Sequence, residues 1–130
     1  MSRWLLAFAF TQAVEVPVYV RALGPGRRLA GRALIAFGAS AITHPIVWFA
    51  LPRLWERLYL ALVGLSAGFV IRAPLARYAC MALLAETFAV VVEWAYLRGF
   101  GVRRAWLWSL GANGASVTLG LASRALLGVP

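Results

Sequence analysis

The chain has 130 residues, of which 63% are hydrophobic and 13% charged, and its mean hydropathy is +0.82. In a typical soluble domain about a quarter of the residues are charged. A soluble domain of this size also has too small an interior to bury so much apolar surface, so the composition excludes an ordinary water-soluble fold. The net charge of +9 comes from thirteen arginines against four glutamates. The arginines cluster in one segment or flank apolar stretches, and this placement favours lipid phosphates over nucleic acid as their partner.

Five apolar stretches approach the ~20 residues that an α-helix needs to cross ~30 Å of hydrocarbon. They lie at about 4–22, 33–51, 58–73, 76–97 and 105–127. Residues 1–13 resemble a signal peptide, but the apolar run continues to Val20, which favours an uncleaved first transmembrane helix. We therefore predict an all-α, polytopic membrane bundle of about five helices, forming a single domain over residues 1–130.

The breaks between the stretches are chemically marked. A Gly-Pro-Gly turn at 24–26 follows the first stretch, Pro52 is predicted to end the second, Pro74 follows the third, and Gly101 precedes the fifth. The third stretch is short because Arg57 and Arg72 bound it. Four full spans plus one re-entrant helix is therefore the alternative architecture.

A basic segment follows the first stretch, and it contains Arg21, Arg27, Arg28 and Arg32. Short basic loops are retained on the cytoplasmic side of a membrane and are attracted to anionic headgroups. We expect these four side chains to bind anionic lipids, with the N-terminus outside and, after five spans, the C-terminus inside. The use of arginine in place of every lysine is typical of a GC-rich genome. We expect the chain to lie in a bacterial cytoplasmic (inner) membrane.

Polar side chains interrupt the apolar stretches, where an ionisable group costs several kcal/mol unless it is paired. On the first stretch they recur at helical spacing and share one face: Gln12, Glu15 and Tyr19. On the second stretch a similar face carries Ser40, Thr43 and His44. Pro45 removes a backbone donor directly after His44, so the spacing predicts a kink there.

The fourth stretch carries Glu86 and Glu93 two helical turns apart, and the fifth carries a stripe of small and hydrogen-bonding residues. At 1.5 Å per residue, most of the ionisable groups fall within roughly 5 Å of the midplane, and Glu93 about 8 Å away. We predict an intramembrane polar centre, with Glu86 as its middle, formed by Glu15, His44, Glu86, Glu93 and Asn113. The supporting residues are Gln12, Tyr19, Thr43, Ser109 and Ser116.

Buried carboxylates and an imidazole alternate between charged and neutral forms, which is the chemistry of a proton relay. The polar centre therefore favours a component of a proton- or cation-coupled transporter or channel. Five short helices leave little room for an enclosed path, so we expect a homo-oligomer or a membrane protein partner, with the GxxxG pair Gly64 and Gly68 as a close-packing surface. The alternative is a structural or assembly subunit of a membrane complex, in which the polar layer only holds helices in register.

The segment Glu93-Trp94-Ala95-Tyr96-Leu97-Arg98 resembles the first motif of the glutamic-type CPBP intramembrane proteases, in which a pair of glutamates precedes an arginine. The resemblance implies a third function, an intramembrane hydrolase in which glutamate activates water with downstream histidine and asparagine groups. In this chain Trp94 stands in place of the second glutamate, and His44 lies upstream of the motif.

The sequence predicts neither a cofactor nor a metal site. The single cysteine, Cys80, excludes an internal disulfide and a multi-cysteine metal site. Glu15, His44, Glu86 and Glu93 are acceptable ligands for zinc or iron, but they form no His-Glu-x-x-His or Glu-x-x-His motif.

Overall fold

The computed structural model describes residues 3–65 and 74–128, and this part of the chain is helical with no strand. The helices are α1 (Arg3–Ala22), α2 (Leu29–Pro45), the π-helical turn η1 (Ile46–Ala50), α3 (Leu51–Leu65), α4 (Pro74–Gly99) and α5 (Ala105–Leu127). The apolar stretches predicted at 4–22, 76–97 and 105–127 correspond to α1, α4 and α5.

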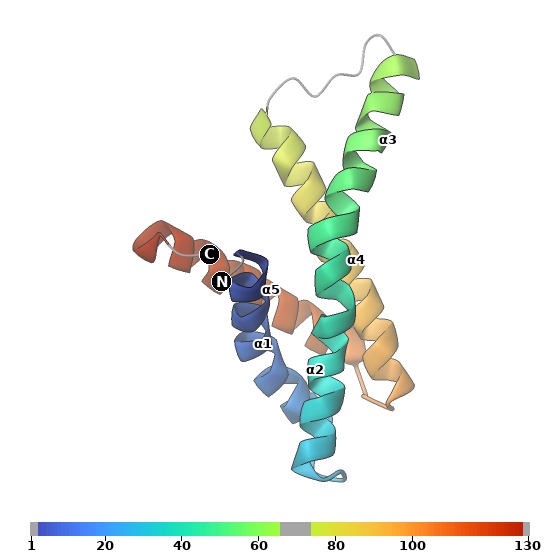
Figure 1. Cartoon of the computed structure of the whole chain (residues 1–130). Helices are drawn as coiled ribbons and strands as arrows, with labels where there is room; N and C mark the ends of the chain where they lie inside the picture. Colours follow the sequence, from blue (N-terminus) through green and yellow to red (C-terminus); the bar gives the residue numbers. More distant parts are fainter. Residues whose placement is uncertain (1–2, 66–73, 129–130) are drawn as a thin grey trace.

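The segments α2, η1 and α3 run on as one helix without a break, so the predicted end of a helix at Pro52 is wrong (Figure 1). The π turn supplies the physical reason. In it the N–H of Leu51 bonds to the carbonyl of Ile46, five residues back, and this wider turn lies between Pro45 and Pro52, the two residues without a backbone donor. Arg53 satisfies one carbonyl of this region, because its guanidinium donates to Phe49 O at 2.7 Å.

The predicted second and third stretches are therefore parts of the same helix. Of the third stretch, 58–73, residues 66–73 lie outside the described part of the chain, and with them Gly68 and Arg72. A kink was predicted at Pro45, beside His44, and the π turn η1 begins directly after this proline.

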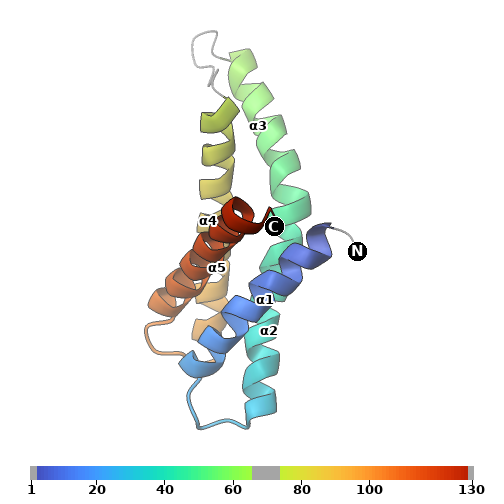
Figure 2. The same cartoon turned by 90° about the vertical axis from the view of Figure 1, so that its left-hand side faces the viewer.

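Four segments pack in a closed ring in the order α1, α2, α4, α5, because each contacts two of the others and α5 returns to α1 (Figures 1 and 2). The helix α3 continues past this ring, where it packs against α4. There the guanidinium of Arg77 lies 4.0 Å from the centre of the Tyr59 ring. The ring arrangement gives the bundle an interior bounded by four helices.

The loops that follow α1 and α4 lie side by side at one end of the molecule (Figure 1). Arg27 crosses from the first loop to the second, where it donates to Phe100 O at 3.0 Å, and its guanidinium lies 5.7 Å from the centre of the Phe100 ring. Both loops turn at a glycine of positive φ, Gly24 at 67° and Gly101 at 80°. This end, called the arginine end below, gathers Arg21, Arg27, Arg28, Arg32, Arg98, Arg103 and Arg104.

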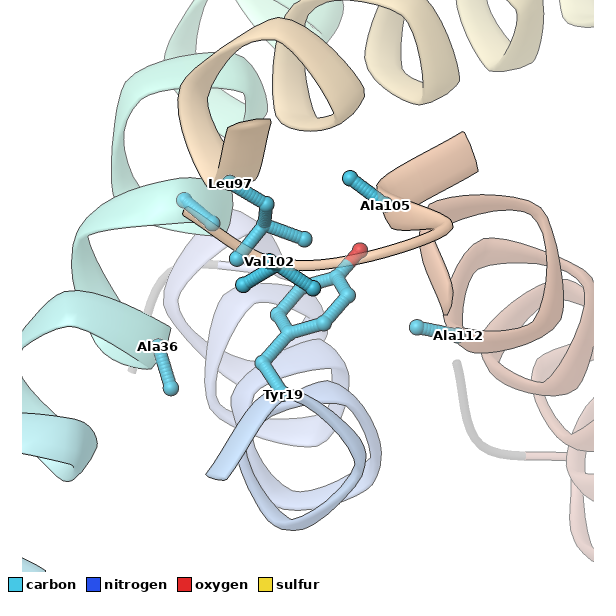
Figure 3. Close-up of a cluster of buried hydrophobic side chains, with 7 residues drawn as sticks. Tyr19, Ala36, Leu97, Val102, Ala105 and Ala112 are labelled. Carbon is cyan, nitrogen blue, oxygen red and sulfur yellow. The ribbon is translucent and has the colours of Figure 1, made fainter. Parts of the chain in front are cut away.

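A small apolar cluster fills the bundle at the arginine end. It has seven buried members, and we call the six that are labelled in Figure 3 the apolar plug: Tyr19, Ala36, Leu97, Val102, Ala105 and Ala112. Tyr19 and Leu97 have no exposed surface. The alanines of the plug, Ala36, Ala105 and Ala112, let the helices approach closely around the Tyr19 ring.

Large apolar side chains point outward instead of inward. Leu34 is 72% exposed and Leu83 68%, whereas Glu15 and Glu93 are each 1% exposed. Three helices are long and apolar enough to cross a membrane: α1, the continuous helix over Leu29–Ala61, and α4. This distribution is the reverse of that in a water-soluble bundle.

Candidate functional site

The hydrogen bonds in the middle of the ring converge on Glu93 of α4. Its Oε1 accepts a bond from Thr43 Oγ1 at 2.7 Å, and its Oε2 accepts bonds from Asn113 Nδ2 at 2.8 Å and from the Tyr19 hydroxyl. These donors come from α2, α5 and α1 in turn. One carboxyl group therefore joins all four helices of the ring.

The neighbouring bonds fix these donors in place. Asn113 Nδ2 also lies 3.0 Å from Ser109 O, one turn back on α5, and 3.3 Å from the Tyr19 hydroxyl. Ser109 Oγ donates to Val90 O at 2.8 Å, which ties α5 to α4 one turn before Glu93. The polar stripe of α5 thus faces the interior, as a helix of 3.6 residues per turn requires for positions 109 and 113.

A second buried carboxyl, Glu15 of α1, accepts a hydrogen bond from Ser40 Oγ of α2. Ser40 is one turn from Thr43, which serves Glu93, so adjacent turns of α2 hold the two carboxyl groups. Residues 12, 15 and 19 were predicted to share a face. Tyr19 and Glu15 indeed both point inward, while both amide atoms of Gln12 are buried without a hydrogen-bond partner among the described residues.

A cavity of about 300 Å³ extends from this network away from the arginine end. Its lining runs along α4 from Glu93 to Tyr78, roughly 22 Å, and along α5 from Asn113 to Arg124. None of the six apolar-plug residues lines it. The cavity therefore has a carboxyl-rich floor, and the apolar plug closes the bundle beyond that floor.

Glu86 lines the cavity two turns from Glu93 along α4 and is partly exposed. It forms no hydrogen bond with any residue that the structure describes. The sequence predicts Glu86 as the middle of the polar centre, whereas the converging hydrogen bonds lie at Glu93. Glu86 is the carboxyl that a molecule in the cavity can contact without displacing a protein donor.

His44 also lines the cavity, and aromatic rings surround its imidazole. Trp48 stacks on it at 6.1 Å between ring centres, Phe8 meets it at 5.2 Å and Trp4 at 6.2 Å. Its Nδ1 is buried without a hydrogen-bond partner in the described part of the chain. His44 is therefore placed by aromatic packing and is not joined to the Glu93 network.

Sequence reasoning missed several cavity residues, among them Tyr78, Trp48 and Arg124. A weak signal existed for Tyr78, since positions 78, 86 and 93 are spaced by eight and seven residues and so share one face of α4. Ser116, predicted as a supporting residue, lines the cavity as well.

Within residues 3–65 and 74–128, no three side chains of histidine, cysteine, aspartate or glutamate are placed to hold a metal ion. Glu15 and Glu93 are instead engaged by hydroxyl and amide donors, which are hydrogen-bond partners of carboxyl groups.

The segment that resembles a protease motif has a different environment at each end. Glu93 is buried with three side-chain donors on its two oxygens, so little acceptor capacity remains for a water molecule, and Arg98 is exposed at the arginine end. This geometry does not favour the hydrolase reading.

No family model matches the chain, and neither curated proteins nor solved structures provide a significant match to it.

Proposed function

We propose that this chain is an integral protein of a bacterial cytoplasmic membrane and that it crosses the bilayer four times. The crossings are α1, the continuous helix that begins at Leu29, α4 and α5. The outward apolar side chains support this arrangement. The helix over Leu29–Ala61 has 33 residues and is roughly 50 Å long, so its last part, with Arg53 and Arg57, extends past ~30 Å of hydrocarbon into the interface.

The arginine end faces the cytoplasm in this proposal. Its seven arginines lie in two short loops and the helix ends beside them, which is the arrangement that the positive-inside rule describes. With four crossings, the start of α1 and the end of α5 both lie on the outer side. Five crossings would instead have put the C-terminus inside. Arg21, Arg27, Arg28 and Arg32 bind anionic lipid headgroups, and Arg98, Arg103 and Arg104 join them.

The cavity binds protons or cations as part of membrane transport. The observation that carries this proposal is Glu86, a carboxyl in a cavity without a hydrogen bond from a described residue, two turns from the saturated Glu93. A cation that enters from the outer side reaches Glu86 first and stops at the Glu93 floor. Passage to the cytoplasm requires the apolar plug to open, and movement of these helices within a homo-oligomer of this chain completes the path.

The rival function is a structural subunit, in which the polar groups only hold four helices in register. The Glu93 network by itself fits that role, because its carboxyl has partners on every neighbouring helix. Glu86 and the cavity distinguish the two proposals, since a purely structural centre has no use for a carboxyl without donors, whose placement at membrane depth costs free energy.

Proton flux into liposomes tests the transport proposal. The purified protein is reconstituted with a pH-sensitive dye inside, and a potassium gradient with valinomycin provides the driving force. We expect the wild-type protein to give flux above that of protein-free liposomes. Glu86→Gln is expected to decrease this flux at least about tenfold, which corresponds to 1.4 kcal/mol. Glu56→Gln is expected to leave it unchanged, because its carboxyl is exposed on α3. Flux equal to that of empty liposomes, or undiminished in Glu86→Gln, contradicts the proposal.

A further inference from the structure

The cavity is larger than a proton or a bare inorganic ion needs. Its volume of about 300 Å³ is roughly ten times the ~30 Å³ that one water molecule occupies in the liquid. It lies at the lower limit of the range typical of small-molecule pockets, ~300–1,000 Å³. The size therefore fits a small organic molecule.

The walls of the cavity are largely apolar and aromatic. The apolar and aromatic side chains that line it include Phe10, Val47, Trp48 and Val117. A hydrated inorganic ion gains little from such walls, whereas an alkyl or aryl group buries its surface against them. Trp48 and Tyr78 line the cavity and are 41% and 57% exposed. One face of the Trp48 ring stacks on His44, and aromatic rings are surfaces that attract cations.

The charged groups of the cavity favour a cationic ligand. Glu15, Glu86 and Glu93 line it together with one guanidinium, that of Arg124, and the imidazole of His44. Glu15 and Glu93 already accept hydrogen bonds from the protein, so Glu86 is the carboxyl left for the ligand. Arg124 is exposed in the last turn of α5, away from Asn113, and lies at the outer end of the cavity.

We infer that the cation taken by this cavity is an organic ammonium ion with an apolar substituent, whose nitrogen pairs with Glu86 and whose substituent packs against Trp48 and Tyr78. This inference rests on the proposed function and specifies its substrate class. An inorganic metal ion is the competing ligand, and the absence of a three-ligand cluster in the described residues disfavours it.

Binding of benzyltrimethylammonium to the full chain in lipid nanodiscs tests the inference. This probe keeps its charge at every pH and carries one aromatic group, and binding is measured by calorimetry and by quenching of tryptophan fluorescence. We expect saturable binding that Glu86→Gln weakens at least tenfold and that Glu56→Gln leaves unchanged. Trp48→Leu is expected to weaken binding by several-fold, because it removes a cation–π surface and keeps an apolar wall.

A second variant and a second ligand keep the outcomes distinct. Glu86→Asp retains the charge and is expected to retain binding, which separates loss of the carboxylate from loss of the fold. Sodium, potassium and zinc ions are tested as chlorides and are expected not to compete with the probe. Absence of saturable binding, or equal binding by Glu86→Gln, overturns the inference. If Glu86-dependent proton flux persists in that case, the substrate class is wrong and the transport proposal stands.

Discussion

Glu86 and Glu93 are the same residue type on the same face of α4, yet their surroundings give them different roles. Glu93 accepts bonds from Tyr19, Thr43 and Asn113 and is 1% exposed, whereas Glu86 is partly exposed in the cavity. A buried donor that loses its acceptor retains the full cost of its desolvation. Glu93 is therefore expected to matter most for folding, and Glu86 for ligand binding.

Replacement of Glu93 by alanine tests this division. Tyr19 loses its acceptor, while Thr43 and Asn113 keep only bonds to carbonyls of their own helices, so we expect the free energy of unfolding to fall by roughly 1–3 kcal/mol. Glu86→Ala removes a carboxyl without a donor and is expected to lower it by less. Thermal unfolding in mild detergent, followed by circular dichroism, measures both. Equal melting temperatures for the two variants would show that the Glu93 network does not hold the helices together.

At the scale of the elements, close approach of α2 and α4 depends on Gly38. A Cβ at this position would lie 2.5 Å from Tyr96 Oη and 3.3 Å from Tyr96 Cζ, both closer than ordinary contacts. The Tyr96 ring also lies 5.0 Å from the Phe100 ring, near the arginine end. The glycine thus lets a tyrosine of α4 lie directly against the backbone of α2.

Gly38→Ala is expected to displace Tyr96 and to lower the melting temperature, with a cost of about 1–3 kcal/mol typical of overpacking. Gly111→Ala is the matched control, because a Cβ at that helical position meets no atom within 4 Å. Alanine has the higher helix propensity, so the control is expected to be neutral or stabilising. A Gly38→Ala protein as stable as the control would mean that Tyr96 moves without cost.

At the scale of the whole molecule, continuity of the helix through η1 decides the topology. With one helix from Leu29 to Leu65, the loops after α1 and α4 lie at the same end and Arg27 bonds to Phe100 O. A chain with five crossings would separate these loops by the full thickness of the bilayer. The seven arginines of the arginine end then could not act as one basic surface.

Cysteine labelling in intact cells distinguishes the two topologies. In a Cys80→Ser background, single cysteines are placed at Gly26 and Gly99, where a Cβ meets no atom within 4 Å. We expect both positions to resist a membrane-impermeant thiol reagent and to react with a permeant one, because the proposed arrangement puts both on the cytoplasmic side. Labelling of one position alone by the impermeant reagent contradicts the four-crossing arrangement, and labelling of both reverses its orientation.

The sequence by itself determined which segments are helical and which polar residues face inward on each. Composition and the 3.6-residue period are local properties, so they predicted α1, α4 and α5 and the inward faces of Glu15, Tyr19, Thr43 and Asn113. The tertiary structure alone decided that Pro52 does not end a helix, because the adjacent π turn changes the hydrogen-bond pattern around it. It also decided that the hydrogen-bond donors meet at Glu93 and not at Glu86. Which carboxyl they reach depends on the relative positions of four helices, and the local sequence does not specify these positions.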